Sequence, residues 1–260
     1  MATANQLRYF KVMGERNTGT NFLHQLIAGS TSGIEGLVHG SNDSVKKSTQ
    51  GLPENLQYFA RQRAIDILRK QEFSHNFGWK HARVDPAYLQ QSPRFAETLF
   101  VFIVRNPFYF LSALFRRPYN LLPRAGDDKS RFLRSPILLN ERDNICGTAT
   151  LENPVRLWSI KTRSYVQTAA QIERALLIRY EDLVAQPDSI LAMLAKKGAE
   201  TAPNVQVPQQ STKGDNLTFG DYARKTAAYD YRSDHSASDI GFITEQLDAE
   251  TLDQLGYRPD

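Results

Sequence analysis

Apolar residues along the chain follow two patterns: short continuous runs, and longer stretches with helical spacing. The continuous runs lie at 98–104 (TLFVFIV) and 175–180 (ALLIRY), with a shorter one at 8–13 (RYFKVM). Runs without polar alternation are typical of strands that are buried on both faces of a parallel sheet. We predict strands at these three places and a further strand at 76–82 (NFGWKHA).

Stretches with helical spacing separate the predicted strands. Pro107 follows the strongest apolar run and fits the first turn of a helix. Strands that alternate with helices predict right-handed βαβ units and a mostly parallel sheet. The expected fold is one α/β domain over residues 1–260, with a central sheet flanked by helices. The predicted helices cover 22–29, 55–71, the residues after Pro107, 154–174, 187–198 and about 244–255.

Three long segments are polar and carry no clear periodicity: 31–54, 118–153 and 200–240. Long irregular segments of a compact domain are often lids or binding loops. We expect them to form an acceptor pocket or a lid. The arginines in and beside the second segment either favour an anionic acceptor, such as a carbohydrate, or form only a solvated face; they are Arg116, Arg117, Arg124, Arg131 and Arg134.

Charge and cysteine content narrow the classes of partner. The chain has 32 Lys and Arg against 28 Asp and Glu. This mild excess of positive charge suits an anionic ligand and an ordinary surface equally. It is smaller than the excess expected of a dedicated nucleic-acid-binding protein. Cys146 is the single cysteine, so no intrachain disulfide or thiol pair for a metal is possible. The sequence shows neither an apolar leader nor an apolar run of membrane length. We therefore predict a cytoplasmic protein that binds neither membrane nor nucleic acid.

Residues Gly14–Asn21 (GERNTGTN) combine a predicted strand, a glycine-bearing turn and a predicted helix. The spacing of glycine, four residues and glycine is that of a P-loop, whose N–H groups form a cradle for anions. A nucleoside triphosphatase would continue with Lys and Ser or Thr, whereas Thr20 and Asn21 stand here. The other interpretation is a plain strand-to-helix turn with Thr18 as helix cap.

Two further places offer candidate chemistry. Arg105 follows the run 98–104, so it lies at the carboxyl end of a predicted parallel strand, where α/β folds bind ligands. Its guanidinium could hold a phosphate in a bidentate manner, or could simply end the strand in solvent. Lys80 and His81 place a cation beside an imidazole, which suits an anion and a proton transfer together, although a lone histidine is more often structural.

Taken together, these residues resemble the PAPS-dependent sulfotransferase family (PAPS is 3′-phosphoadenosine 5′-phosphosulfate). Residues 18–22 are similar to the family's 5′-phosphosulfate loop, and Lys80-His81 resembles the Lys-Thr-His strand end that carries its catalytic base. Arg105 with Ser112 looks like the 3′-phosphate site. The stretch Tyr180-Glu181-Asp182-Leu183 and the late Lys213-Gly214 are similar too.

Three departures from the family pattern concern spacing. The family's basic residue directly precedes the Ser or Thr of the loop, whereas Asn17 stands there and Arg16 lies one residue earlier. The interval from Arg105 to Ser112 is one residue shorter than usual. Lys80 directly precedes His81, and adjacent residues of a strand face opposite ways, so the strand prediction separates these two side chains.

The resemblance implies transfer of a sulfuryl group from PAPS to a hydroxyl or amine of a small-molecule or carbohydrate acceptor, with adenosine 3′,5′-bisphosphate (PAP) as product and no metal. It implies His81 as general base, with Arg16 and Lys80 stabilising the leaving group. A divergent P-loop nucleotide kinase and a catalytically inactive nucleotide-binding module are the alternatives. The implied donor-binding residues are Arg16, Asn17, Thr18, Gly19, Thr20, Asn21, Arg105, Ser112, Tyr180, Lys213 and Gly214.

Overall fold

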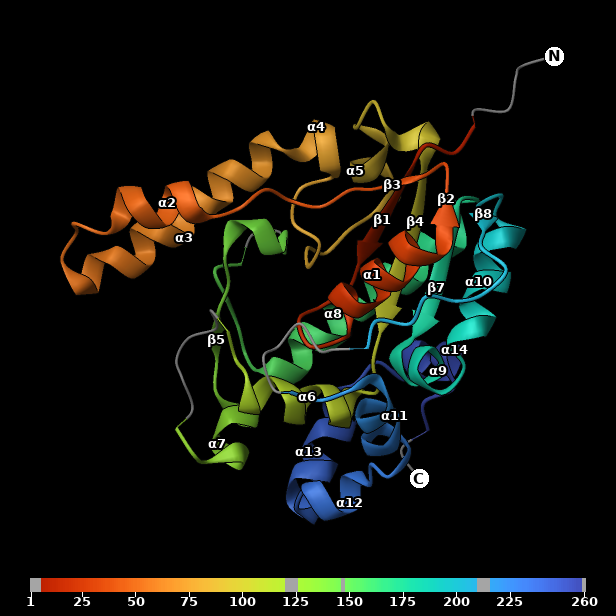
Figure 1. Cartoon of the computed structure of the whole chain (residues 1–260). Helices are drawn as coiled ribbons and strands as arrows, with labels where there is room; N and C mark the ends of the chain where they lie inside the picture. Colours follow the sequence, from red (N-terminus) through yellow and green to blue (C-terminus); the bar gives the residue numbers. More distant parts are fainter. Residues whose placement is uncertain (1–5, 120–125, 146–147, 210–215, 259–260) are drawn as a thin grey trace.

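The computed structural model describes residues 6–119, 126–145, 148–209 and 216–258. A parallel four-stranded sheet with the order β3-β1-β4-β7 forms the centre of a single α/β domain (Figure 1). This confirms the predicted fold class. The strands are β1 (Tyr9–Met13), β3 (Glu35–Gly36), β4 (Thr98–Val104) and β7 (Ala175–Arg179).

Strand β4 has all seven residues buried, which explains its continuous apolar sequence. Its side chains alternate between two hydrophobic clusters, one on each face of the sheet. Phe100, Phe102 and Val104 belong to one cluster, and Leu99, Val101 and Ile103 to the other. The central strand is therefore covered on both sides, as its sequence predicts.

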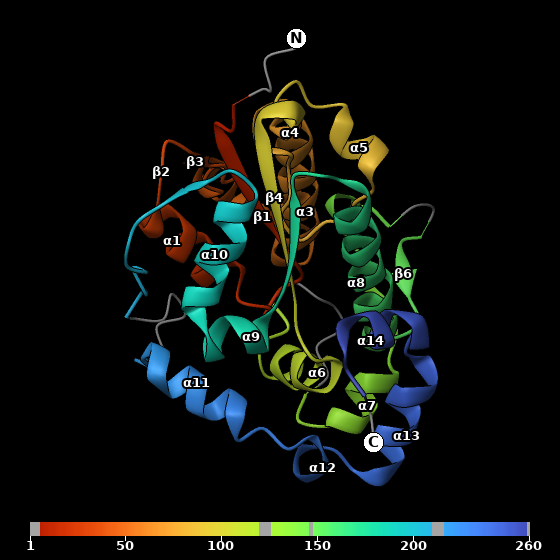
Figure 2. The ribbon, with the colours of Figure 1, turned by 90° about the vertical axis from the view of Figure 1, so that its right-hand side faces the viewer.

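Helices cover the two faces of the sheet (Figure 2). Trp158 and Tyr165 of α8 (Pro154–Gln171) and Phe110 of α6 (Pro107–Arg116) pack in the cluster with Phe100. Helices α1 (Thr20–Ser30), α9 (Tyr180–Ala185) and α10 (Pro187–Lys196) contribute to the opposite cluster. The helices predicted at 22–29, at 55–71 and after Pro107 are confirmed. Those predicted at 154–174 and 187–198 are confirmed as well, although they end at Gln171 and Lys196. In the part of the chain that is described, no helix combines the length and apolar character needed to cross a membrane.

The remaining elements are short, apart from α3, which projects with α2 from the body of the molecule (Figure 1). Two small antiparallel pairs join β2 with β8 and β5 with β6. The bounds are β2 (Thr31–Ser32), α2 (Asp43–Thr49), α3 (Glu54–Gln71), α4 (Phe73–Asn76), α5 (Pro86–Gln90), η1 (Phe95–Glu97), α7 (Lys129–Arg134), β5 (Ile137–Leu138), η2 (Glu141–Asp143), β6 (Thr150–Leu151), β8 (Glu200–Thr201), α11 (Phe219–Ala227), α12 (Tyr231–Asp234), α13 (Ala237–Gln246) and α14 (Ala249–Leu255).

The strand predicted at 76–82 is wrong. Helix α4 ends at Asn76, and the next two residues, Phe77 and Gly78, have φ angles of 61° and 64°. Left-handed backbone cannot continue a strand. The backbone beyond it turns, and its polar groups bond to other segments and to side chains of α8 rather than to a neighbouring strand. The sequence of residues 76–82 therefore resembles that of a strand, whereas the segment folds as a turn.

The three segments predicted as loops contain helices, so this prediction is partly wrong. Helix α2 lies within 31–54, α7 within 118–153, and α11 and α12 within 200–240. They are short, and α11 has no buried residue, so no continuous apolar run marks it in the sequence. Side-chain caps mark its start instead, where Thr218 and Asp221 form a capping box. The helix predicted at about 244–255 is two helices, because Asp248 begins α14 as its N-cap.

Candidate active site

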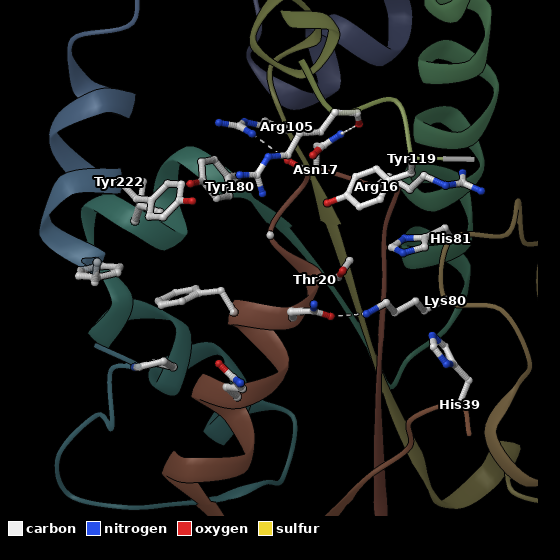
Figure 3. A pocket seen from close by; sticks show the side chains of 18 of the residues that line it. Arg16, Asn17, Thr20, His39, Lys80, His81, Arg105, Tyr119, Tyr180 and Tyr222 are labelled. Atoms are coloured by element: carbon white, nitrogen blue, oxygen red, sulfur yellow. Dashed lines mark hydrogen bonds between the residues drawn. The ribbon is translucent and has the colours of Figure 1, made fainter. Parts of the chain in front are cut away.

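A cavity of about 500 Å³ opens at the carboxyl end of the sheet (Figure 3). Its lining comes from the loop after β1, from Arg105 after β4 and from Tyr180 after β7, which is the edge where parallel sheets bind ligands. Two groups of lining residues differ in character. We call Arg16, Lys80, His81, Arg105 and Arg117 the charged wall, and Phe22, Tyr180, Phe219 and Tyr222 the aromatic wall. Among the lining residues that are described, none is Asp or Glu.

The loop between β1 and α1 is closely packed and tightly turned. Gly14 leaves no room for a Cβ because the carbonyl oxygen of Ile103 lies against it. Gly19 has a φ of 90°, and a Cβ there would lie 2.8 Å from the ring of Tyr180. The hydroxyl of Thr18 donates to the carbonyl of Glu15 at 2.6 Å and does not cap α1, so the helix-cap interpretation of Thr18 is wrong.

Helix α1 begins at this loop with its N-terminus at the cavity. Its first residues, Thr20, Asn21 and Phe22, line the cavity, and the first intrahelical bond at this end comes from the N–H of Leu23 to Gly19. The N–H groups of a first helical turn lack intrahelical acceptors and form the positive end of the helix. The loop and helix therefore present an environment that favours an anion.

Arg105 is 3% exposed, and its guanidinium lies between two tyrosine rings. The guanidinium carbon is 3.5 Å from the ring centre of Tyr109 and 4.2 Å from that of Tyr180. One N–H donates to the carbonyl of Asn17 at 2.8 Å, whereas Nε has no hydrogen-bond partner among the described residues. No carboxylate in the described part of the chain pairs with Arg105. A buried cation thus lines the cavity without a counter-charge from the described residues.

His81 lies in the charged wall with one ring nitrogen already bonded. Its Nδ1 is 2.5 Å from the carbonyl oxygen of Gly14, and a carbonyl only accepts, so Nδ1 carries the proton. Nε2 of the neutral ring is then the atom with a free lone pair. Burial, reinforced by the nearby charges of Lys80 and Arg16, lowers the pKa of His81 well below its ordinary value. The imidazole is therefore held neutral, with Nε2 as its unprotonated nitrogen.

Lys80 lies beside His81 in the cavity lining, so both side chains reach the site despite being adjacent (Figure 3). The turn at 79–82 makes this possible, whereas a strand would have separated them. The Lys80 ammonium donates to the side-chain oxygen of Asn21 on α1. Burial lowers the pKa of Lys80 to about 8, so this amine is charged at neutral pH and loses its charge in mildly alkaline solution.

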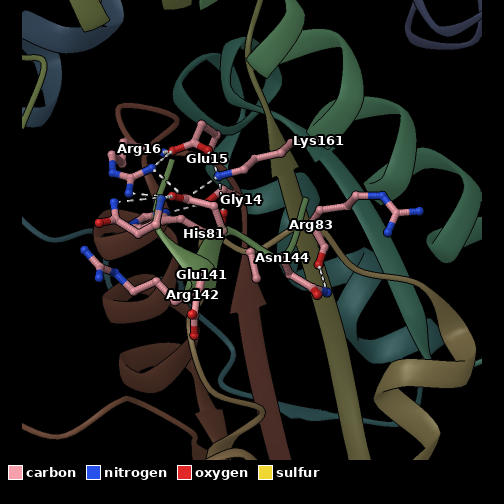
Figure 4. Close-up of polar contacts among 12 residues, drawn as sticks. Gly14, Glu15, Arg16, His81, Arg83, Glu141, Arg142, Asn144 and Lys161 are labelled. Carbon is pink, nitrogen blue, oxygen red and sulfur yellow. Dashed lines mark hydrogen bonds and ion pairs between the residues drawn. The ribbon is translucent and has the colours of Figure 1, made fainter. Parts of the chain in front are cut away.

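Arg16 also lines the cavity, but carboxylates already pair with it (Figure 4). Its guanidinium lies 2.7 Å from Glu15 and 3.3 Å from Asp143. Lys161 of α8 contacts both of these carboxylates. We call Glu15, Arg16, Asp143 and Lys161 the buried ion cluster. Although burial opposes it, Asp143 and Glu15 raise the pKa of Arg16, and Lys161 and Arg16 hold the pKa of Asp143 well below its usual range.

The other predicted site residues divide between the cavity and the interior. Asn17, Gly19 and Tyr180 line the cavity, whereas Ser112 does not: its hydroxyl is buried 2.9 Å from Nε2 of His235. Lys213 and Gly214 lie outside the described residues, as does Arg124. Of the described arginines at 116–134, only Arg117 lines the cavity, and Arg134 instead pairs with Asp239.

Sequence reasoning missed several residues of the site. The ring of Trp79 lies between His81 and His39, with centroids 4.8 and 5.1 Å away. Phe22 and Phe219 stack at 5.2 Å across the aromatic wall. Trp79 was visible beside the Lys80-His81 pair, but nothing local links Phe219 to Phe22, which is almost 200 residues away. For Lys161 and Asp143 the sequence offers only one signal, which is a lysine one helical turn after the apolar pair Leu157-Trp158.

Comparisons with known proteins give distant structural likeness only. No family model matches the chain, and no curated protein matches its sequence. The chain is similar to a sulfotransferase domain from the curacin biosynthetic pathway, with 13% identity, a TM-score of 0.42 and coverage of 98% of this chain and 99% of that one. It is also similar to a sulfotransferase domain from the Synechococcus PCC 7002 olefin synthase, with 14% identity, a TM-score of 0.41 and coverage of 94% and 96%. Likeness this distant identifies neither a family nor a substrate, so the side chains of the cavity carry the functional argument.

Proposed function

We propose that the protein is a PAPS-dependent sulfotransferase that transfers a sulfuryl group to a hydroxyl or amine of a small-molecule or carbohydrate acceptor. The observation that carries this proposal is the state of Arg105. A guanidinium that is 97% buried and has no carboxylate partner among the described residues is costly unless a ligand supplies the negative charge. The protein as described supplies two aromatic rings and one carbonyl, which leaves room for an anion.

The charged wall suits a ligand with more than one anionic group. Arg105 supplies one cationic centre, and Lys80 with the N-terminus of α1 supplies another. Because the described lining contains no carboxylate, nothing there repels an anion. These features fit PAPS, with the loop and Lys80 proposed for its phosphosulfate and Arg105 for its 3′-phosphate. The rings of Phe22 and Phe219 offer a flat apolar surface for its base.

The donor supplies an activated sulfuryl group and an anionic leaving group. What the chain itself contributes is orientation, charge and a proton acceptor. We propose that Nε2 of His81 takes the proton from the acceptor, because Gly14 fixes the proton on Nδ1 and burial keeps the ring neutral. The Lys80 ammonium would stabilise charge on the leaving group.

Arg16 has a different role in this proposal. Two carboxylates already balance its charge, so less of that charge is available to a ligand. We propose that Arg16 mainly holds the loop in place and that Lys80 is the principal leaving-group cation. Ser112 is left out because its hydroxyl contacts His235 outside the cavity. A cytoplasmic location remains a proposal from the sequence.

A divergent nucleotide kinase is the second candidate, favoured only by the strand–loop–helix at the N-terminus. Kinases and NTPases hold magnesium with carboxylate or amide oxygens beside the phosphates. The described lining offers amides but no carboxylate. A binding module without catalysis would share the charged wall, so only turnover separates it from an enzyme.

Sulfuryl transfer from labelled PAPS to a panel of phenols, alcohols, amines and simple sugars tests the proposal. We expect label in at least one acceptor, formation of PAP in equal amount, and no requirement for ATP or Mg²⁺. A protein that binds PAP tightly yet labels nothing across the panel is a binding module. Phosphoryl transfer from ATP–Mg²⁺ to an acceptor, with no transfer from PAPS, would support the kinase instead.

A further inference from the structure

One face of α8 is polar although it is buried against the core. The side chains at positions i, i+3, i+4 and i+7 of this face bond to the backbone of residues 81–84, immediately after the loop that carries Trp79 and Lys80. They replace the strand partner that this segment lacks. The bonds are Lys161 to the carbonyl of His81 (2.7 Å), Tyr165 to that of Ala82 (3.0 Å), Thr168 to that of Val84 (3.4 Å), and the Val84 N–H to Ser164 (3.3 Å).

Lys161 differs from its three neighbours because it also reaches the loop after β1. Its ammonium is fully buried and has three acceptors: a carboxylate oxygen of Glu15, the carbonyl of His81, and Asp143 at 2.8 Å. An ammonium has three N–H bonds, so all of its donors are used. One atom therefore joins the loop, the His81 segment and η2 (Figure 4).

The imidazole of His81 connects the same two segments from the other side. Its Nδ1 bonds to Gly14, the residue directly before Glu15, and the N–H of Gly14 bonds to the carbonyl of Lys80 at 3.0 Å. Lys161 thus closes a ring of contacts around His81 without lining the cavity itself. The loop that would hold the donor and the histidine that would take the proton are fixed to each other by these bonds.

We propose that Lys161 is a positioning residue that fixes His81 relative to the loop after β1. The role in turnover rests on the proposed function, whereas the structural link to His81 does not. Lys161 touches no ligand in this proposal; it acts through the backbone of His81 and through Glu15. Loss of its ammonium should leave the donor site formed and move the base away from its productive position.

Substitution of Lys161 also changes the charge around His81. The charged groups that act on His81 are Lys80 from its own segment, Arg16 from the loop and Lys161 from α8. Glu15 of the loop and Asp143 of η2 pair with Lys161 and so lie behind it. Lys161 is among the cations that lower the pKa of His81, so its removal raises that pKa. A double variant, Lys161→Met with Asp143→Asn, removes one charge of each sign and separates lost position from altered charge.

The experiment compares wild type, Lys161→Met, the double variant and Thr168→Val, a control on the same helix face that touches neither His81 nor the buried ion cluster. Imidazole ¹⁵N spectra of the ligand-free proteins report the tautomer and titration of His81, while kinetics with PAPS report kcat and KM. For both Lys161 variants we expect kcat to fall roughly tenfold to a hundredfold, with the donor KM nearly unchanged. The Nδ1–H tautomer of His81 should become less populated.

The pH profiles then distinguish the effect of the altered charge around His81 from the effect of its altered position. Lys161→Met should move the acid limb of kcat/KM to higher pH, and the double variant should return it towards wild type while kcat stays low. Thr168→Val should keep wild-type kinetics and spectra. If Lys161→Met does not fold, the double variant alone tests whether Lys161 positions His81.

Wild-type kcat and an unchanged His81 spectrum in the double variant would overturn the proposal. If wild-type protein shows no sulfuryl transfer, the proposed function fails, and the ligand-free spectra still decide whether Lys161 fixes His81.

Discussion

Two arginines line the same cavity with almost equal burial and opposite surroundings. Arg16 is 4% exposed and Arg105 is 3% exposed. Arg16 lies between the carboxylates of Glu15 and Asp143, whereas Arg105 lies between the rings of Tyr109 and Tyr180 and forms no ion pair with a described carboxylate. Residue type and burial therefore do not tell a structural cation from a ligand-binding one. The groups that contact each guanidinium distinguish the two.

The energetic consequence differs between the two regions. In the buried ion cluster, the two cations and two carboxylates balance, so removal of any one leaves an uncompensated charge. Around Arg105 the uncompensated charge already exists, and the aromatic rings only reduce its cost. A protein retains such a charge at a cost in stability, which is reasonable where a bound anion repays it.

The largest expected effect is on stability, at Arg16. Arg16→Met leaves Glu15 and Asp143 with Lys161 alone, so we expect a loss of about 3–5 kcal/mol in the free energy of unfolding. Arg105→Met removes a charge that lacks a carboxylate and should cost clearly less. Chemical denaturation of both variants measures the difference. Equal losses would remove the contrast between the two arginines.

The next effect concerns turnover and depends on His81 rather than on either arginine. Glutamine can hydrogen-bond through its side chain but cannot take the acceptor's proton, so His81→Gln should lower kcat on the order of a hundredfold or more. PAP affinity and melting temperature, measured on the same preparations, should change little. Near-normal turnover per folded molecule would leave acceptor deprotonation without a base.

A smaller effect is expected on donor binding at Arg105. Arg105→Gln should weaken PAP binding roughly tenfold to a hundredfold, because hydrogen bonds to a charged group are lost. Adenosine 5′-monophosphate, which lacks the 3′-phosphate, should bind wild type and variant alike. Titration calorimetry gives both affinities. Unchanged PAP affinity in the variant would take Arg105 out of the donor site.

The smallest effect is a pH dependence from Lys80. Its pKa of about 8 means that the amine is charged below pH 8 and becomes neutral above it. PAP affinity should therefore weaken as pH rises, by roughly tenfold between pH 8 and 9.5. Lys80→Arg keeps its charge and should abolish this loss. An affinity that is flat over this range in wild type would show that Lys80 does not contact the anion.

The sequence predicted the sheet better than the site. Residues 98–104 form β4 over the whole predicted range, because a strand buried on both faces has a continuous apolar sequence. The strand prediction for residues 76–82 failed because the positive φ angles of Phe77 and Gly78 depend on surrounding structure. Local propensity cannot show that α8 supplies the hydrogen-bond partners of this segment.

The candidate residues Arg105, Lys80 and His81 were found because each follows an apolar run or stands beside another reactive group. The groups that surround these side chains could not be predicted from the sequence. Arg16 lies 127 residues from Asp143, and Glu15 lies 146 residues from Lys161, so the pairing that neutralises Arg16 arises only in the folded chain. For the same reason, the sequence alone suggested a catalytic role for Arg16 and none for Lys161.

Binding of PAP to the wild-type protein tests the central claim most directly. If the uncompensated charge of Arg105 and the loop after β1 form a site for a nucleotide with 3′ and 5′ phosphates, titration calorimetry should show PAP in Mg²⁺-free buffer binding roughly tenfold or more tightly than ATP in buffer with Mg²⁺. Adenosine 5′-monophosphate should bind more weakly than PAP. ATP–Mg²⁺ binding as tightly as PAP, or more tightly, would contradict the account.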